Sequence, residues 1–267
     1  MRLATWNLNS IRARLPRLLA WLERTDVDVV ALQETKIDDE RFPRAELAAA
    51  GYEVASFGFS QWNGVALLSR VGLTDVTVGL PGAPTWTKDT DTPAVVEARA
   101  IGATCGGVQV WSLYVPNGRA IGDPHYDYKL QWLAALRDFG AKTLADAPDL
   151  PMALCGDFNI APTDDDIWSV EYFHGSTHVT PPEREAFAAV VDAGFTDVVR
   201  PHAPGPGTFT YWDYTQLSFP KRRGMRIDFA LASPALADRV TGAFIDREER
   251  KGKGASDHAP VVVEFEA

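Results

Sequence analysis

Short apolar segments that each run into a cluster of polar residues recur along this chain, and they constrain its fold more than any other feature. Residues 2–6 (RLATW) run into Asn7, and residues 27–32 (VDVVAL) lead to Glu34. Further segments of this kind lie at residues 64–68, 108–115, 152–155, 227–231 and 261–265. Segments this short and this apolar are typical of β-strands buried within a sheet. The chain is therefore expected to contain many buried strands.

Helical periodicity separates several of these segments. In residues 11–24, apolar side chains recur every three or four positions from Ile11 onward, which predicts a helix. Two more helices are predicted over residues 126–145 and 183–193. Buried strands mixed with helices predict an α/β fold in which two β-sheets pack face to face with helices outside. No repeat or low-complexity linker is visible, so residues 1–267 are expected to form one domain.

The first residues and the two cysteines limit where such a protein is expected to act. Residues 1–10 (MRLATWNLNS) contain no long apolar run, so the sequence indicates neither a secretory signal nor a membrane-spanning helix. Cys105 and Cys155 each lie in an apolar stretch, and two isolated cysteines do not make a disulfide framework. We expect two buried free thiols in a cytoplasmic protein, associated with the nucleoid if the source is bacterial.

The net charge of −10 at first argues against a nucleic-acid partner. The charges are unevenly distributed, because residues 217–258 carry nine Lys or Arg against six Asp or Glu. A locally basic face on an acidic protein is compatible with phosphate binding. An ordinary solvated surface has the same composition, so charge alone leaves both interpretations open.

Carboxylate and amide side chains lie at the ends of the apolar segments or interrupt them. Glu34 follows one predicted strand, Asp157 and Asn159 follow another, and Asp228 lies inside the apolar segment RIDFAL. Oxygen ligands without cysteine favour a hard cation such as Mg²⁺ or Mn²⁺. Because a buried carboxylate is costly unless it is paired or metal-bound, Asp228 is the strongest single indication of a functional centre.

Each polar residue also has an ordinary structural explanation when it is taken singly. Asn7 is a candidate turn residue or helix cap, and Glu34 is a candidate surface acid. Residues 156–159 (GDFN) have the composition of a tight turn. Isolated aromatic residues such as Tyr114 and Trp212 are more often part of a core. A functional interpretation therefore needs the whole set of residues.

Six sequence motifs occur in a fixed order along the chain. They are ATWNLNSIRAR, ALQETK, LYVPNG, CGDFNIAP, RIDFALAS and SDHAPV. Each motif is weak alone, but together they resemble the exonuclease III family of apurinic/apyrimidinic endonucleases, within the endonuclease/exonuclease/phosphatase superfamily. The resemblance runs from Met1 to the C-terminus. It implies a four-layer α/β sandwich and metal-dependent cleavage of DNA, either 5′ to abasic sites or from 3′ ends.

The resemblance also implies a metal site that holds Mg²⁺ or Mn²⁺. Asn7 and Glu34 resemble the core ligands, and Asp257 resembles a metal or water contact. The predicted metal-site residues are Asn7, Glu34, Asp157, Asn159, Asp257 and His258.

The same resemblance implies catalytic roles for residues of the later motifs. Tyr114 resembles the tyrosine that contacts the scissile phosphate. Asp157 resembles the residue that orients or deprotonates the attacking water, and Asn159 resembles the amide that stabilises the developing charge. Asp228 resembles the partner that orients the catalytic histidine, which is His258.

Substrate contacts are implied around the RID segment, where family members enclose a flipped-out sugar. The predicted substrate-binding residues are Asn117, Tyr211, Trp212, Met225, Arg226, Ile227, Lys221 and Arg222. Met225 departs from the bulky tryptophan of some relatives, and a flexible methionine is expected to admit 3′ ends that carry a base. Phosphate contacts are predicted for Lys221, Arg222, Arg223 and Lys253, with Arg12, Arg119 and Lys129 as an alternative set.

The expected partner is double-stranded DNA with abasic sites or 3′ ends, bound by a monomer that does not contact a membrane. One alternative is another phosphodiesterase or phosphatase of the superfamily, although LYVPNG, TYWDY and the short length favour the DNA-repair branch. A second alternative is a non-catalytic DNA-binding protein on the same fold. Such a protein should have lost site residues, and all the motif positions are intact.

Overall fold

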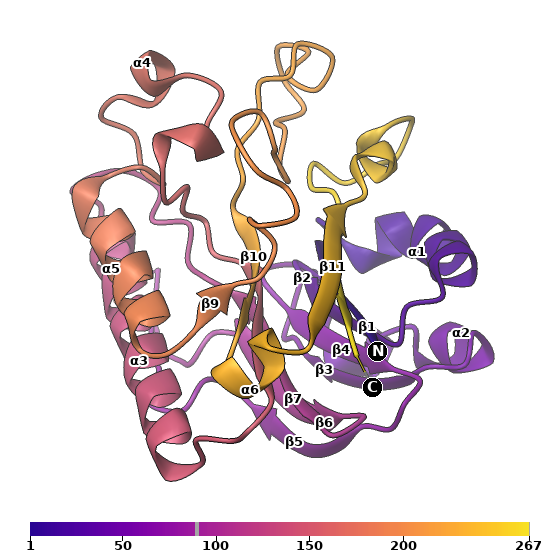
Figure 1. Ribbon diagram of the computed structural model, residues 1–267. Helices are drawn as coiled ribbons and strands as arrows, with labels where there is room; N and C mark the ends of the chain where they lie inside the picture. The colour runs from indigo at the N-terminus through magenta and orange to yellow at the C-terminus, as the bar shows by residue number, and fades with distance from the viewer. Residues whose placement is uncertain (89–90, 267) are drawn as a thin grey trace.

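The computed structural model describes residues 1–88 and 91–266, and two six-stranded β-sheets form its centre (Figure 1). The first sheet contains β1 (Arg2–Asn7), β2 (Val29–Gln33), β3 (Glu53–Phe57), β4 (Val65–Ser69), β11 (Val240–Ile245) and β12 (Val261–Phe265). The second contains β5 (Thr74–Val78), β6 (Ala100–Cys105), β7 (Val108–Tyr114), β8 (Met152–Asp157), β9 (Thr196–Asp197) and β10 (Asp228–Ala232). Their orders are β11-β12-β1-β2-β4-β3 and β5-β6-β7-β8-β10-β9. Both sheets mix parallel and antiparallel pairs.

Helices cover the outer face of each sheet, which gives the predicted four-layer α/β sandwich (Figure 1). The helices are α1 (Ile11–Thr25), α2 (Arg44–Ala49), α3 (Pro124–Asp146), α4 (Val170–Phe173), α5 (Pro181–Asp192) and α6 (Pro234–Ala237). Short 3₁₀ turns lie at Asp39–Arg41, Asp164–Asp166 and Arg247–Arg250. Within the described residues, no helix combines the length and the apolar character that crossing a membrane requires.

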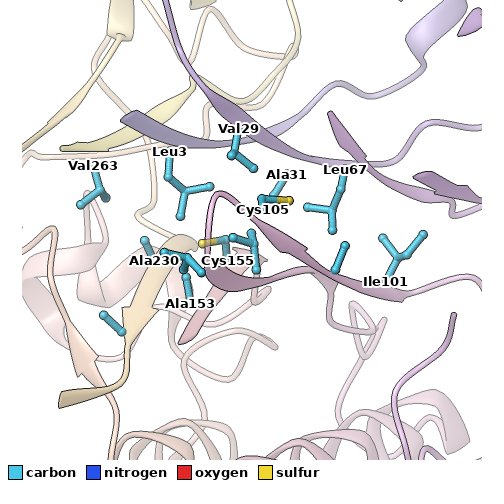
Figure 2. Packing of buried hydrophobic residues seen from close by; sticks show 14 of the residues in the cluster. Leu3, Val29, Ala31, Leu67, Ile101, Cys105, Ala153, Cys155, Ala230 and Val263 are labelled. Atoms are coloured by element: carbon cyan, nitrogen blue, oxygen red, sulfur yellow. The ribbon is translucent and has the colours of Figure 1, made fainter. Parts of the chain in front are cut away.

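The two inner sheet faces form one apolar core (Figure 2). Leu3 and Val29 of the first sheet pack against Ile101 and Ala153 of the second. Small and β-branched side chains allow the two sheets to approach closely and interdigitate. Cys105 and Cys155 lie in this core as free thiols, as predicted.

The helix starts differ from the predicted ones for a local reason. Helices α3 and α5 begin at Pro124 and Pro181, whereas the apolar periodicity predicted starts at residues 126 and 183. Proline is favoured in the first helical turn, where its missing N–H is not needed. Asp123 and Thr180 precede these prolines, and their side chains accept backbone N–H hydrogen bonds.

Several strands carried no sequence signal. All five residues of β5 are exposed, so that edge strand lacks the apolar run that marks a buried strand. Strand β6 is buried but consists largely of small residues. At its centre, a side chain on Gly102 would collide with the Trp111 ring of β7, since an added Cβ would lie 2.5 Å from that ring.

Candidate active site

Strand pairing gathers the predicted site residues at one end of the two sheets. Asn7 ends β1, and the parallel neighbour β2 ends opposite it at Gln33, one residue before Glu34. In the second sheet, Asp157 pairs with Tyr114 of β7 on one side and with Asp228 of β10 on the other. Because the sheets pack face to face, these strand ends face a common space.

An amide joins the two central carboxylates. The Asn7 Nδ2 group donates to Glu34 Oε1 and to Asp157 Oδ2, each at 2.9 Å. Lys36 forms an ion pair with Glu34 at 2.6 Å. Burial raises the pKa of Glu34, but Lys36 and Asn7 outweigh it and hold that pKa below its ordinary value. Glu34 is therefore ionised at neutral pH.

His258 is held opposite these carboxylates by a buried acid. Its Nδ1 lies 2.8 Å from Asp228 Oδ2, and its Nε2 lies 3.8 Å from Asp157 Oδ2. Burial lowers the pKa of His258, but the charge and hydrogen bond of Asp228, assisted by Asp157, raise it to about 10. The imidazole is thus a cation that can donate from Nε2.

The pKa of Asp157 is also raised, which for an acid favours the neutral form. Its side chain is 1% exposed, and burial raises its pKa to about 7, against the opposing charge of His258 and with the help of Asp228 and Glu34. A bound divalent cation would oppose this rise. A carboxyl group poised near neutrality suits the exchange of a proton with water.

Two asparagines form the next layer of the site. The backbone N–H of Asn159 donates to Asp157 Oδ1 at 2.9 Å, and its Nδ2 donates to the carbonyl of Val115 at 2.9 Å. Asn117 Nδ2 donates to Asn159 Oδ1 at 3.2 Å. Asn159 has φ 51°, a left-handed conformation that asparagine adopts more readily than most residues. Both asparagines line the same cavity as Asp157.

Tyr114 and Asp257 complete the rim. The guanidinium of Arg99 lies 4.9 Å from the centre of the Tyr114 ring. Burial, with the nearby charge of Glu34, raises the pKa of Tyr114 well above its ordinary value, so the phenol stays a hydrogen-bond donor. Asp257 Oδ1 accepts from Asn9 Nδ2 at 3.1 Å.

The donor set fits a hard divalent cation. Three side chains each offer one possible ligand atom, and these atoms lie within 4.8 Å of one another. The residues are Glu34, Asp157 and His258. The two carboxylates are the ligands that Mg²⁺ or Mn²⁺ prefers. His258 is bound to Asp228 and protonated, so it suits hydrogen-bond donation better than ligation. Asn7 turns its Nδ2 group to the carboxylates, so ligation through its oxygen requires the amide to turn over.

A cavity of about 140 Å³ opens above the carboxylates. It is lined by Glu34, Tyr114, Asn117, Asp157, Asn159, His178, Tyr211, Met225, Ile227, Asp257 and His258. Sequence reasoning missed only His178 of this set, because that histidine lies in a segment without any of the six motifs. Its Nδ1 lies 2.5 Å from the carbonyl of Asn159, and burial with the charge of Lys129 lowers its pKa to about 4. His178 is therefore a neutral wall residue.

The structure corrects two predicted substrate contacts. Trp212 is 1% exposed and packs with Phe209 and Phe219 away from the cavity, so it does not enclose a sugar. Arg226 is also buried, and its guanidinium pairs with Asp166 and Asp197. Both residues stabilise the loops that carry the site.

The predicted phosphate contacts lie on the surface, with one exception. Lys221, Arg222 and Lys253 are exposed, as are Arg12 and Arg119 of the alternative set, whereas Arg223 is half-buried. Lys129 is instead fully buried, and its ammonium donates to Glu183 and to the carbonyls of Asn159 and Asn117. It supports the site from below and cannot contact a phosphate.

This fold and this centre of carboxylates faced by a histidine cation define a hydrolase of phosphate esters. The sequence matches the Endonuclease/Exonuclease/phosphatase family over residues 4–258, and the chain belongs to that family. The exodeoxyribonuclease III of Haemophilus influenzae is 30% identical over 273 residues, which cover 99% of this chain and 100% of that relative.

Two solved structures show the same fold over their full lengths. The 3′ phosphatase NExo from Neisseria, bound to a product DNA hairpin, matches with a TM-score of 0.91 and 38% identity, covering 100% of both chains. An AP endonuclease from Archaeoglobus fulgidus matches with a TM-score of 0.90 and 33% identity, again covering 100% of both chains.

Proposed function

We propose that this protein is a DNA-repair phosphodiesterase that uses Mg²⁺ or Mn²⁺ to hydrolyse the DNA backbone. It cleaves 5′ to abasic sites, removes nucleotides from 3′ ends of duplex DNA, or does both. The observation that carries the proposal is the convergence of Glu34, Asp157 and the Asp228–His258 pair on one open cavity. The exodeoxyribonuclease and AP endonuclease relatives support the choice of DNA.

A phosphodiester resists hydrolysis because its anionic oxygens repel the attacking water. When bound, the cation polarises a phosphoryl oxygen and offsets the charge that develops there. Glu34 and Asp157 would hold it, with Asn7 fixing the distance between the two carboxylates. Lys36 keeps Glu34 anionic. The chain thus supplies a preorganised set of oxygen ligands.

The proton transfers are assigned to the buried acid and the histidine. Asp157 orients a water molecule and accepts its proton, since its carboxylate lies beside Asn7 and faces the His258 ring. His258 donates a hydrogen bond from Nε2 to a phosphoryl oxygen, and Asp228 keeps the imidazolium in place. Asn159 stabilises the negative charge that develops on the phosphoryl oxygens. The products are a 3′-hydroxyl end and a fragment with a 5′-phosphate.

The substrate is proposed to place a sugar against Tyr211, Met225 and Ile227, beside the carboxylates. An abasic sugar has no base to unstack, so its extrusion from the duplex costs less than that of a normal nucleotide. Lys221 and Arg222 would contact backbone phosphates from the loop before β10. We further propose that residues 1–267 form a single domain that acts as a cytoplasmic monomer, at the nucleoid if the source is bacterial.

A substrate panel tests the function. The purified protein is incubated with an end-labelled abasic duplex, an intact duplex with a recessed 3′ end, and a duplex ending in a 3′-phosphate, with Mg²⁺ or with EDTA. Cleavage of at least one DNA in Mg²⁺ and none in EDTA is expected. Hydrolysis of a phospholipid or inositol phosphate in place of DNA would support another branch of the superfamily. DNA binding without cleavage would support a non-catalytic role.

A further inference from the structure

A second cavity, of about 210 Å³, adjoins the catalytic cavity. His178, Tyr211 and Met225 line both. The other walls include Trp168, Tyr172, Phe173 and Arg223, and we call this cavity the aromatic chamber. Because the two cavities share these wall residues, the aromatic chamber lies directly beyond Met225 from the carboxylates.

The walls of the aromatic chamber are flat and aromatic. The ring centroids of Trp168 and Tyr172 lie 4.9 Å apart, and the guanidinium of Arg223 lies 4.7 Å from the Trp168 ring. Tyr172 is 57% exposed and is not part of the apolar core between the two sheets. Aromatic rings and arginine planes are the surfaces on which proteins stack unpaired nucleobases. The chemistry of the walls therefore fits a planar heteroaromatic ring.

Met225 lies between the two cavities. Its backbone pairs with Tyr211 on one side and Ile167 on the other, so the position of its side chain is fixed at the shared wall. The unbranched thioether of methionine is narrow and adapts to neighbouring groups. An indole at this position would extend further and occupy more of the space between the carboxylates and the chamber.

We propose that the aromatic chamber binds the base of the nucleotide that the enzyme releases from a DNA 3′ end; this inference rests on the proposed function. In that reaction an O–P bond forms from water, and the bond from phosphorus to the neighbouring 3′ oxygen breaks. The proton lost by water balances the one gained by that oxygen. The released nucleotide keeps the phosphorus, so its sugar lies against Met225 and its base projects into the chamber.

A fluorescent base tests the occupancy of the chamber without any catalysis. The Asp157→Asn variant is titrated with a duplex whose 3′-terminal nucleotide is 2-aminopurine, while a second label reports binding. The emission of the terminal base is expected to change on binding because the base leaves its neighbour and stacks on Trp168. The change should disappear in Asp157→Asn/Trp168→Ala and persist in Asp157→Asn/Trp168→Phe. An unchanged signal in the Trp168→Ala background overturns the proposal.

A cleavage ratio tests the consequence for the reaction. Two duplexes are compared, one with an ordinary 3′-terminal nucleotide and one with a base-less tetrahydrofuran nucleotide at that end. Trp168→Ala and Tyr172→Ala should each lower kcat/KM for the base-bearing end about tenfold more than for the base-less end. Met225→Trp should shift the ratio in the same direction by occupying more of the space between the carboxylates and the chamber.

The matched control is Phe244→Ala, which removes an exposed aromatic ring of β11 that does not line the chamber. It should leave both rates unchanged. Equal losses on both duplexes in the chamber variants would overturn the base-binding role. Absence of cleavage of either duplex by the wild-type protein would instead remove the 3′-end activity on which this inference rests, and the fluorescence titration would still decide the occupancy of the chamber.

Discussion

The ammonium group of Lys129 on α3 and the carboxylate of Glu183 on α5 form an ion pair beneath the active site, and neither side chain has any exposed surface. The same ammonium donates to the backbone carbonyl of Asn159 at 2.7 Å and to that of Asn117 at 3.2 Å. Glu183 also caps its own helix through Thr180. One buried pair thus anchors the two turns that carry the catalytic amides.

Replacing the buried cation should destabilise the protein strongly. Lys129→Met leaves the Glu183 carboxylate buried and unpaired, and removal of one partner from such a pair costs about 3–5 kcal/mol. Turnover should fall as well, because the turns of Asn117 and Asn159 lose their common donor. Denaturant unfolding and steady-state cleavage measure the two effects. Lys142→Met on the same helix breaks an exposed pair with Asp146 and should cost at most about 1 kcal/mol. Similar losses in both variants would contradict the assignment.

The stability contributed by Glu183 should depend on pH with a defined sign. Burial raises the pKa of Glu183, but the charge and hydrogen bond of Lys129 outweigh it and hold the pKa below the ordinary value of 4.5. The contribution is therefore complete above pH 4.5 and is lost as the pH falls through the lower folded-state value. The difference in unfolding free energy between the wild type and Glu183→Gln should be constant near neutrality and shrink in acid. A difference that grows in acid would show that the pair is wrongly assigned.

Cleavage should require a divalent hard cation. The carboxylates of Glu34 and Asp157 form an oxygen site, so excess EDTA should abolish turnover, and Mg²⁺ or Mn²⁺ should restore it. The cation should also raise the Tm of the wild type, because a ligand that binds only the folded state stabilises it. Glu34→Gln should lose most of this Tm shift. Undiminished turnover in excess chelator would remove the metal from the mechanism.

The acid and the histidine should contribute to the rate more than to binding. Asp157→Asn and His258→Ala should each lower kcat by on the order of 10²–10³ or more, with DNA binding still measurable. Asp228→Asn should lower kcat by weakening the imidazolium that it holds. Single-turnover kinetics and a filter-binding titration separate the two quantities. Rates near those of the wild type in either Asp157→Asn or His258→Ala would place the chemistry elsewhere.

Salt dependence should locate the phosphate contacts. Each phosphate neutralised on duplex DNA contributes a slope of about −0.9 in log K against log salt. Reversing the charges of exposed Lys221 and Arg222 together should therefore flatten the slope by about two such contributions. The matched control reverses Arg137 and Lys142, which are exposed on α3 away from the cavity. An unchanged slope would indicate that the DNA phosphates contact other residues, such as Arg12 and Arg119.

Much of the fold followed from the sequence because local patterns reported on burial. The apolar run at residues 261–265 coincides with β12, and the periodicity of residues 11–24 agrees with α1 to within one residue. Edge strands such as β5 escaped prediction because exposed positions impose no apolar pattern. The gathering of Asn7, Glu34 and Asp228 at one centre was implied by the family motifs, whereas their distances came from strand register.

The sequence alone determined most of the buried strands and the three longest helices, because these depend on residue type and short-range periodicity, and its family motifs predicted a catalytic set. It could not determine which way neighbouring side chains face. Along the segment before β10, Met225 and Ile227 line the cavity, while Arg226 between them turns to Asp166. Successive side chains of an extended chain point to opposite sides, and only the packing of the sheets and loops decides which side is the cavity. The same packing buries Lys129 on a helix whose sequence is compatible with exposure.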